Sequence, residues 1–124
     1  MKYLCLVYVA GAKFDAMSPT ELETLGKESM AADEELARSG HLVLAMALES
    51  VSSATTVRVR GGKMSTTTGP FAETAEQLAG FVLVEAVDLN EAIEFAGRIP
   101  LARYGSVEVR PEMDMSTIVE PAAR

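Results

Sequence analysis

Two short stretches of the chain are apolar at every position: residues 3–9 (YLCLVYV) and residues 81–84 (FVLV). In an extended strand, successive side chains point to opposite faces, so a strand of either sequence is apolar on both faces. Strands of this kind lie inside sheets that are covered on both sides. Any fold of this chain must therefore cover both faces of one sheet.

Two helices are predicted between strand-like stretches. Residues 18–21 (SPTE) have the form of a capping box, with Ser18 as the N-cap, Pro19 at the first helical position and Glu21 placed to reach back to the cap. This helix is expected to extend to Arg38 and to end at Gly40. Its expected core-facing side chains are Leu22, Leu25, Met30 and Leu36.

A second capping pattern, residues 88–91 (DLNE), predicts a helix that ends at Pro100. Its expected core face comprises Leu89, Ala92, Ile93, Ala96 and Ile99.

The remaining strands complete the predicted order. They are expected at residues 41–48, 55–60, 63–68, 77–86 and 105–110, and Gly61-Gly62 joins the second and third of these as a tight hairpin with Arg60 opposite Lys63. The result is a single α+β domain over residues 1–124, a ferredoxin-like βαββαβ fold with an inserted β-hairpin and a C-terminal extension at 112–124. Two helices cover one face of its sheet, so we expect a second subunit to cover the other.

A loop of special shape interrupts the strands at residues 68–73 (TGPFAE). Gly69 has access to backbone angles closed to other residues, and Pro70 has a fixed φ angle. Phe71 follows the bend, and we expect its ring to pin the loop to the body of the domain.

Composition excludes several classes of function. The formal net charge is −7, which disfavours direct binding to nucleic acid, and no apolar run approaches the length of a membrane span. The first strand begins too early for a signal sequence, so we expect a cytoplasmic protein. The chain has one cysteine, Cys5, whose apolar neighbours predict a buried thiol, and one histidine. We therefore expect no metal site and no cofactor.

Four segments of the chain resemble the YCII-related family, and specifically its DGPF branch. They are MKYLCLVY at 1–8, ATTVRVRGGK at 54–63, TGPFAETAEQLAGFVLVEAVDLNEAIEFAGRIP at 68–100 and GSVEVRP at 105–111. The resemblance implies a dimeric α+β barrel, in which two ferredoxin-like units place their sheets face to face. It also implies two functions of different classes: lyase- or isomerase-type chemistry on small ring compounds, or an accessory role beside an extracytoplasmic-function sigma factor.

The chain departs from this family pattern at two positions. Thr68 stands where the branch has an aspartate, and Tyr104 stands where a histidine is common. The carboxylate and imidazole chemistry proposed for the wider family requires both groups, so the resemblance does not carry that mechanism over to this chain.

Each candidate site residue also has a structural explanation. His41 is the candidate general base, although its position just after a helix also suits a cap for the last carbonyl groups. Thr68 and Glu73 are candidate ligand-binding groups that are equally ordinary in a turn. Arg58 suits an anionic ligand or plain solvent contact, and Tyr104 suits a pocket wall or packing.

Two hypotheses follow for the function. The first is a small-molecule binder or enzyme with a pocket between the sheet and the helices near the Gly-Pro loop, where polar groups from Thr68, Glu73, His41 and a tyrosine would converge. The second is an accessory protein that binds a regulatory partner through an exposed apolar surface at residues 113–119.

Overall fold

The computed structural model describes residues 1–118. Four antiparallel strands form the main sheet in the order β2 (Leu42–Ala47), β5 (Glu76–Glu85), β1 (Lys2–Ala10) and β6 (Gly105–Pro111). The two central strands are the two that contain the fully apolar stretches. With α2 (Pro19–Arg38) after β1 and α3 (Leu89–Gly97) after β5, the connectivity is the predicted βαββαβ.

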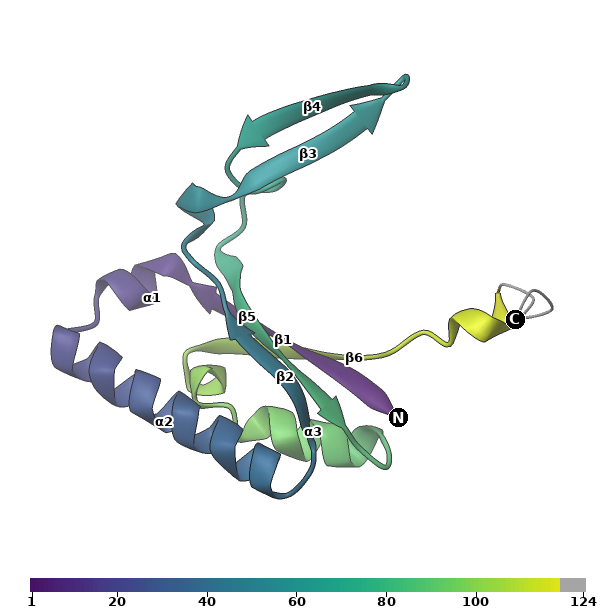
Figure 1. The fold of residues 1–124 in the computed structure, drawn as a ribbon. Coiled ribbons are helices and arrows are strands. Elements are labelled where there is room, and N and C mark those ends of the chain that lie inside the picture. The colour runs from purple at the N-terminus through teal and green to yellow at the C-terminus, as the bar shows by residue number, and fades with distance from the viewer. Residues whose placement is uncertain (119–124) are drawn as a thin grey trace.

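Both long helices cover the same face of the sheet (Figure 1). The core lies between them and the sheet, and its buried members are Tyr3, Cys5, Leu36, Val82, Val84, Ala86, Ala92, Phe95 and Ala96. Tyr3, Cys5, Val7 and Val9 of β1 therefore face the helices, while Leu4, Leu6 and Tyr8 face the other way. The sequence alone left the direction of this alternation open.

We call the sheet surface opposite the helices the open face. Strand register places Leu4 beside Leu83 and Leu6 beside Phe81 on this surface. The edge strand β2 extends it with Leu44 and Met46, which are both exposed. The open face is thus a continuous apolar surface without a cover in the single chain.

The predicted capping box of α2 is present. The Glu21 N–H donates to Ser18 Oγ at 3.1 Å, and the Ser18 N–H donates to Glu21 Oε1 at 3.3 Å. At the other end, Gly40 has a φ of +81°, and the N–H groups of Gly40 and His41 donate to Ala37 and Leu36 at 3.1 and 3.0 Å. This pattern is a Schellman motif, so the predicted end of the helix is confirmed.

The predicted core face of α2 is wrong in part. Leu25 and Leu36 are buried, but Leu22 and Met30 are exposed. At about 100° per residue, Met30 lies about 140° from Leu25 around the helix axis, whereas Leu36 nearly coincides with Leu25. A straight helix that touches the sheet along one line cannot bury Leu25 and Met30 together.

The predicted core face of α3 is also wrong in part, because Leu89 and Ile93 are exposed and Phe95 is buried beside Ala92 and Ala96. The start is capped as predicted, since Asp88 Oδ1 accepts from the Glu91 N–H at 2.9 Å. The Glu91 side chain accepts from the Val87 N–H instead of the cap residue.

Four short helices lie outside the predicted helices of residues 1–118, three of them in predicted connections and the last in the predicted C-terminal extension. They are α1 (Gly11–Asp15), η1 (Val51–Ser53), η2 (Pro100–Arg103) and η3 (Met115–Thr117). The predicted C-terminal extension is described only up to residue 118, so Val119 of the predicted apolar surface lies outside the described residues. Within residues 1–118, no helix combines the length and apolar character that a membrane span requires.

The predicted hairpin is confirmed residue for residue. Strands β3 (Thr55–Arg60) and β4 (Lys63–Thr68) pair with Arg60 opposite Lys63, and Gly61 and Gly62 have φ angles of +57° and +76°. The hairpin forms a separate two-stranded sheet that projects away from the main sheet and from α2 and α3 (Figure 1).

The Cys5 thiol should be chemically silent in the folded protein. Its side chain is fully buried, and desolvation raises its pKa to about 11. Because the thiolate is the nucleophile, we expect Cys5 to react with a disulfide reagent at least about 100-fold more slowly in the native state than in denaturant. Absorbance of the released thiol measures both rates. Equal rates would contradict the burial of this side chain.

Candidate functional site

A pocket of about 540 Å³ lies beneath the base of the hairpin, and we call it the Gly-Pro pocket. Its walls come from the end of β1, the η1 segment, the start of β3, the Gly-Pro loop and the start of β5. The lining residues with the largest apolar groups are Tyr8, Leu48, Val51, Pro70, Phe71 and Leu78. A volume of this size suits a small organic molecule.

Backbone contacts fix the shape of the Gly-Pro loop. Gly69 has a φ of +104°, its N–H donates to the Ala54 carbonyl at 2.7 Å, and its own carbonyl accepts from Thr56 Oγ1 at 2.8 Å. Arg58 Nη2 donates to the Phe71 carbonyl at 3.4 Å. The loop is therefore held to the base of the hairpin by its main chain.

The prediction that Phe71 pins the loop is wrong. Its side chain is 80% exposed and stands at the pocket. Because the hydrogen bonds of Gly69 already fix the loop, the ring is not needed as an anchor. An aromatic ring held in water at the edge of an apolar pocket offers a surface on which a ligand can pack.

The charge of the Gly-Pro pocket restricts its ligands. Glu49 and Glu76 contribute carboxylates, and among the described lining residues there is no lysine, arginine or histidine. Hydrogen-bonding groups come from Tyr8, Thr55 and Gln77. A carboxylate ligand would meet like charge and no lining cation, so the pocket favours a neutral molecule.

The predicted site residues do not converge. Pro70 and Phe71 line the Gly-Pro pocket, and Gly69 and Arg58 adjoin it through their contacts with the loop and the hairpin base. Thr68 pairs with Thr55 at the end of β4, and neither Thr68 nor the exposed Glu73 is part of the lining. Tyr104 follows η2, where the Arg103 guanidinium lies 5.8 Å from its ring centre.

His41 lies at the opposite end of the sheet. It precedes β2, whose first residue Leu42 pairs with Val84 near the end of β5, whereas the Gly-Pro pocket lies at the start of β5. About eight residues of extended chain, roughly 25 Å, separate the two ends. The predicted convergence of His41 with the loop is therefore absent.

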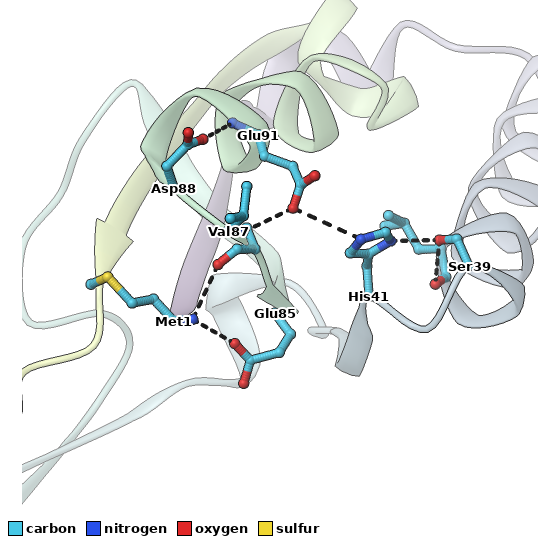
Figure 2. Close-up of polar contacts among 9 residues, drawn as sticks. Met1, Ser39, His41, Glu85, Val87, Asp88 and Glu91 are labelled. Carbon is cyan, nitrogen blue, oxygen red and sulfur yellow. Dashed lines mark hydrogen bonds and ion pairs between the residues drawn. The ribbon is translucent and has the colours of Figure 1, made fainter.

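The contacts of His41 tie two helix ends together (Figure 2). Its Nδ1 lies 2.8 Å from Ser39 Oγ, its Nε2 lies 3.8 Å from Glu91 Oε1, and its ring stacks at a tilt on Phe95 with centroids 4.7 Å apart. The His41 side chain does not cap α2 as predicted. The Leu36 carbonyl at the end of this helix accepts hydrogen bonds from Ser39 Oγ and from the His41 backbone N–H.

Replacing His41 by Asn should cost at most about 1 kcal/mol of stability, because a tilted ring contact and exposed polar contacts are lost while the backbone cap persists. Ligand affinity in the Gly-Pro pocket should not change. Chemical denaturation and ligand titration measure the two effects. A hundredfold loss of affinity in a folded variant would contradict this structural role.

Replacing Gly69 by Ala should destabilise the protein by about 1 kcal/mol or more, because its φ of +104° disfavours a side chain even though no neighbouring atom would touch the added carbon. Gly97→Ala is the matched control, since Gly97 also has open space but no positive φ. Urea denaturation of both variants checks the difference. Equal midpoints would show that the conformation of Gly69 is unimportant.

A second pocket of about 550 Å³ lies on the helix side of the sheet. Leu36, Ala45, Val82, Phe95 and Ile99 line its apolar part, and Asp33, Arg98 and Arg103 stand among the polar lining residues. Burial raises the pKa of the Asp33 carboxyl. Arg103 is already paired with Glu28 at 2.9 Å.

The sequence predicted one pocket, between the sheet and the helices and near the Gly-Pro loop, whereas the structure has a separate pocket at each of these two places. The Leu48, Val51 and Leu78 walls of the Gly-Pro pocket were not predicted. A usable signal was Gly80 within an apolar strand, because glycine there often marks a close backbone approach. Within residues 1–118, no group of three or more His, Cys, Asp or Glu side chains could hold a metal ion.

The architecture defines an α+β protein with a four-stranded antiparallel sheet, two helices on one face and an added hairpin. The model of the YCII-related domain matches residues 1–116, so the chain belongs to the YCII-related family. An uncharacterized protein of Rhizobium meliloti (strain 1021) is 35% identical over 113 residues, covering 90% of this chain and 91% of the relative. The resemblance seen in the sequence is confirmed at the level of the family, and the DGPF branch stays a prediction.

Proposed function

We propose that this YCII-related protein binds a small, neutral ring compound in the Gly-Pro pocket. The observation that carries the proposal is the exposed Phe71 ring at an apolar pocket of about 540 Å³. A planar ligand would stack on this ring and displace water from Leu48, Val51 and Leu78. Tyr8 and Gln77 supply hydrogen-bonding groups that would orient it.

Binding is preferred here to acid-base catalysis for a structural reason. The one histidine lies at the other end of the sheet from the pocket, and its polar contacts are with Ser39 and Glu91. Glu49 and Glu76 contribute the carboxylates of the lining. A lyase- or isomerase-type step would have to use these carboxylates or the Tyr8 hydroxyl.

A thermal-shift screen with matched pairs tests the proposal. Each pair consists of a neutral lactone and its ring-opened hydroxy acid, so that only the charge and the ring closure differ. A neutral compound present at 100 times its dissociation constant should stabilise the fold by about 2.7 kcal/mol, which is a rise of several degrees in the melting temperature. The acid should have a weaker effect.

Two variants show where the ligand binds. Phe71→Ala should weaken the affinity for the best lactone about fivefold, because a stacking contact is worth about 1 kcal/mol. Val87→Ala is the control, since Val87 is 78% exposed and lies between β5 and α3, outside the pocket. Failure of every neutral compound to raise the melting temperature, or equal affinities of the Phe71→Ala and control variants, would overturn the proposal.

We also propose that the protein is a homodimer joined through the open face, as a dimeric α+β barrel. The apolar side chains of β1, β5 and β2 on this face support the proposal, because water would otherwise cover a sheet surface built from leucine, phenylalanine and methionine. The Gly-Pro pocket adjoins this face through Tyr8 and Leu78, which pair across β1 and β5.

An accessory role with an extracytoplasmic-function sigma factor is the second candidate. Met113, Met115 and Ile118 are exposed on the segment after β6, and this observation favours a binding surface there. A chain truncated after Glu112 should then lose binding to a purified sigma factor of this class while keeping its melting temperature. Equal binding by the full and truncated chains would exclude this surface.

A further inference from the structure

The hairpin β3–β4 has two unlike faces. Because residues that oppose one another in an antiparallel pair share a face, Val57, Val59 and Met64 lie together on one side. Arg58, Arg60 and Lys63 lie on the other side. The hairpin, residues 55–68, is thus a ribbon with an apolar face and a basic face.

The apolar face of the hairpin points away from its own chain. Thr56 and Arg58, on the basic side, make the side-chain hydrogen bonds to the Gly-Pro loop. Val57, Val59 and Met64 are 56%, 59% and 71% exposed. An isolated two-stranded hairpin is marginally stable in water. A hairpin whose apolar side faces solvent is therefore stabilised when a second protein surface covers that side.

The charge of the hairpin is opposite to that of the rest of the chain. Residues 55–68 carry three positive side chains and no acid, whereas the rest of the chain has a net charge of −10, which gives the total of −7. A second copy of the chain therefore offers the hairpin an acidic body. Nucleic acid, the other polyanion, would meet that same acidic body at close range.

We propose that the hairpin is an intersubunit arm that lies against the acidic body of a second copy of the chain. It projects beyond the main sheet on the side away from α2 and α3, which is the side where the open face would meet its partner (Figure 1). Its apolar face packs on the partner, and Arg60 and Lys63, which pair beside the turn at the tip of the ribbon, reach the partner's carboxylates past its edge. This inference rests on the proposed dimer, and its test separates the two.

Carbodiimide coupling tests the charged contact, because it joins an amine to a carboxylate only when the two touch. Lys63 is the one lysine of the arm. In a mixture of unlabelled and ¹⁵N-labelled chains at low micromolar concentration, we expect Lys63 to appear in peptides of mixed label. Coupling of Lys63 only to its own chain, or to none, overturns the arm.

Substitution tests the apolar contact. The triple variant Val57→Thr, Val59→Thr and Met64→Thr keeps residues that favour strands, and it should raise the dimer dissociation constant at least about tenfold. Met30→Gln with Val87→Thr, two exposed apolar positions outside both the arm and the open face, should leave it unchanged. A circular dichroism spectrum checks that both variants are folded.

The outcomes separate the two proposals. If the wild-type chain is a dimer, and the triple variant and the control variant have the same dimer dissociation constant, the arm is overturned and the open-face dimer stands. A wild-type monomer overturns both. Mixed-label coupling of Lys63 together with weakened association of the triple variant alone supports the arm.

Discussion

Leu6→Asp should give a folded monomer, whereas Val7→Asp should fail to fold. Leu6 lies on the open face beside Phe81, and Val7 is buried beneath the helices. An unpaired buried carboxylate, together with the lost apolar contacts, should cost about 5 kcal/mol, which is most of the stability of a small domain. On the open face the carboxylate stays in water in the monomer and would be buried only in the proposed dimer.

Circular dichroism and sedimentation measure these two effects. The Leu6→Asp variant should keep its helix signal while its dimer dissociation constant rises at least about 100-fold. Leu6→Met is the matched control, because it keeps an apolar side chain of similar volume. Unfolding of Leu6→Asp, or a folded Val7→Asp variant, would contradict the assignment of the two faces.

Gly80→Ala should be the most destabilising of the glycine replacements considered. The added carbon would lie 2.5 Å from the Met46 carbonyl oxygen and 3.2 Å from the Ala47 Cα atom, and both are backbone atoms of β2. Since the backbone cannot rotate aside as a side chain does, β2 must shift, at a cost of about 2–3 kcal/mol.

Gly26→Ala is the opposite control. Gly26 lies within α2 with nothing near its added carbon, so alanine should stabilise the protein by about 0.5–1 kcal/mol. Urea denaturation of both variants gives the two values. A Gly80→Ala variant as stable as the parent chain would show that β2 and β5 are not packed as closely as described.

The elements predicted correctly are those with local causes. Ser18 and Glu21 lie three residues apart and satisfy each other's backbone groups, so the sequence alone determines where α2 begins. Gly61 and Gly62 determine the register of the hairpin in the same way, because their φ angles permit one tight turn.

The errors concern side chains whose environment depends on distant elements. Met30 is a good helix former with an apolar side chain, and only the docking of α2 on the sheet leaves it exposed. Phe95 is buried because β1, β5 and α2 meet at its position. Spacing along one helix allows more than one apolar face, and only the docking of the helix decides which of them is buried.

The candidate site was predicted in the same partial way. The unusual backbone of Gly69 was foreseen, since a Gly-Pro pair has few alternatives. The direction of the Phe71 ring and the distance of His41 from the loop both depend on how β5 pairs with its neighbours. The family resemblance located the loop but did not reveal the pocket walls at Leu48, Val51 and Leu78.

Sedimentation equilibrium at low micromolar concentration tests most directly the claim that this protein acts as a dimer closed over its open face. The chain has a mass of 13.2 kDa, and we expect a species of twice that mass. In parallel, the Leu6→Asp variant should sediment at the mass of a single chain. A folded wild-type species of 13.2 kDa with no dimer would contradict the account.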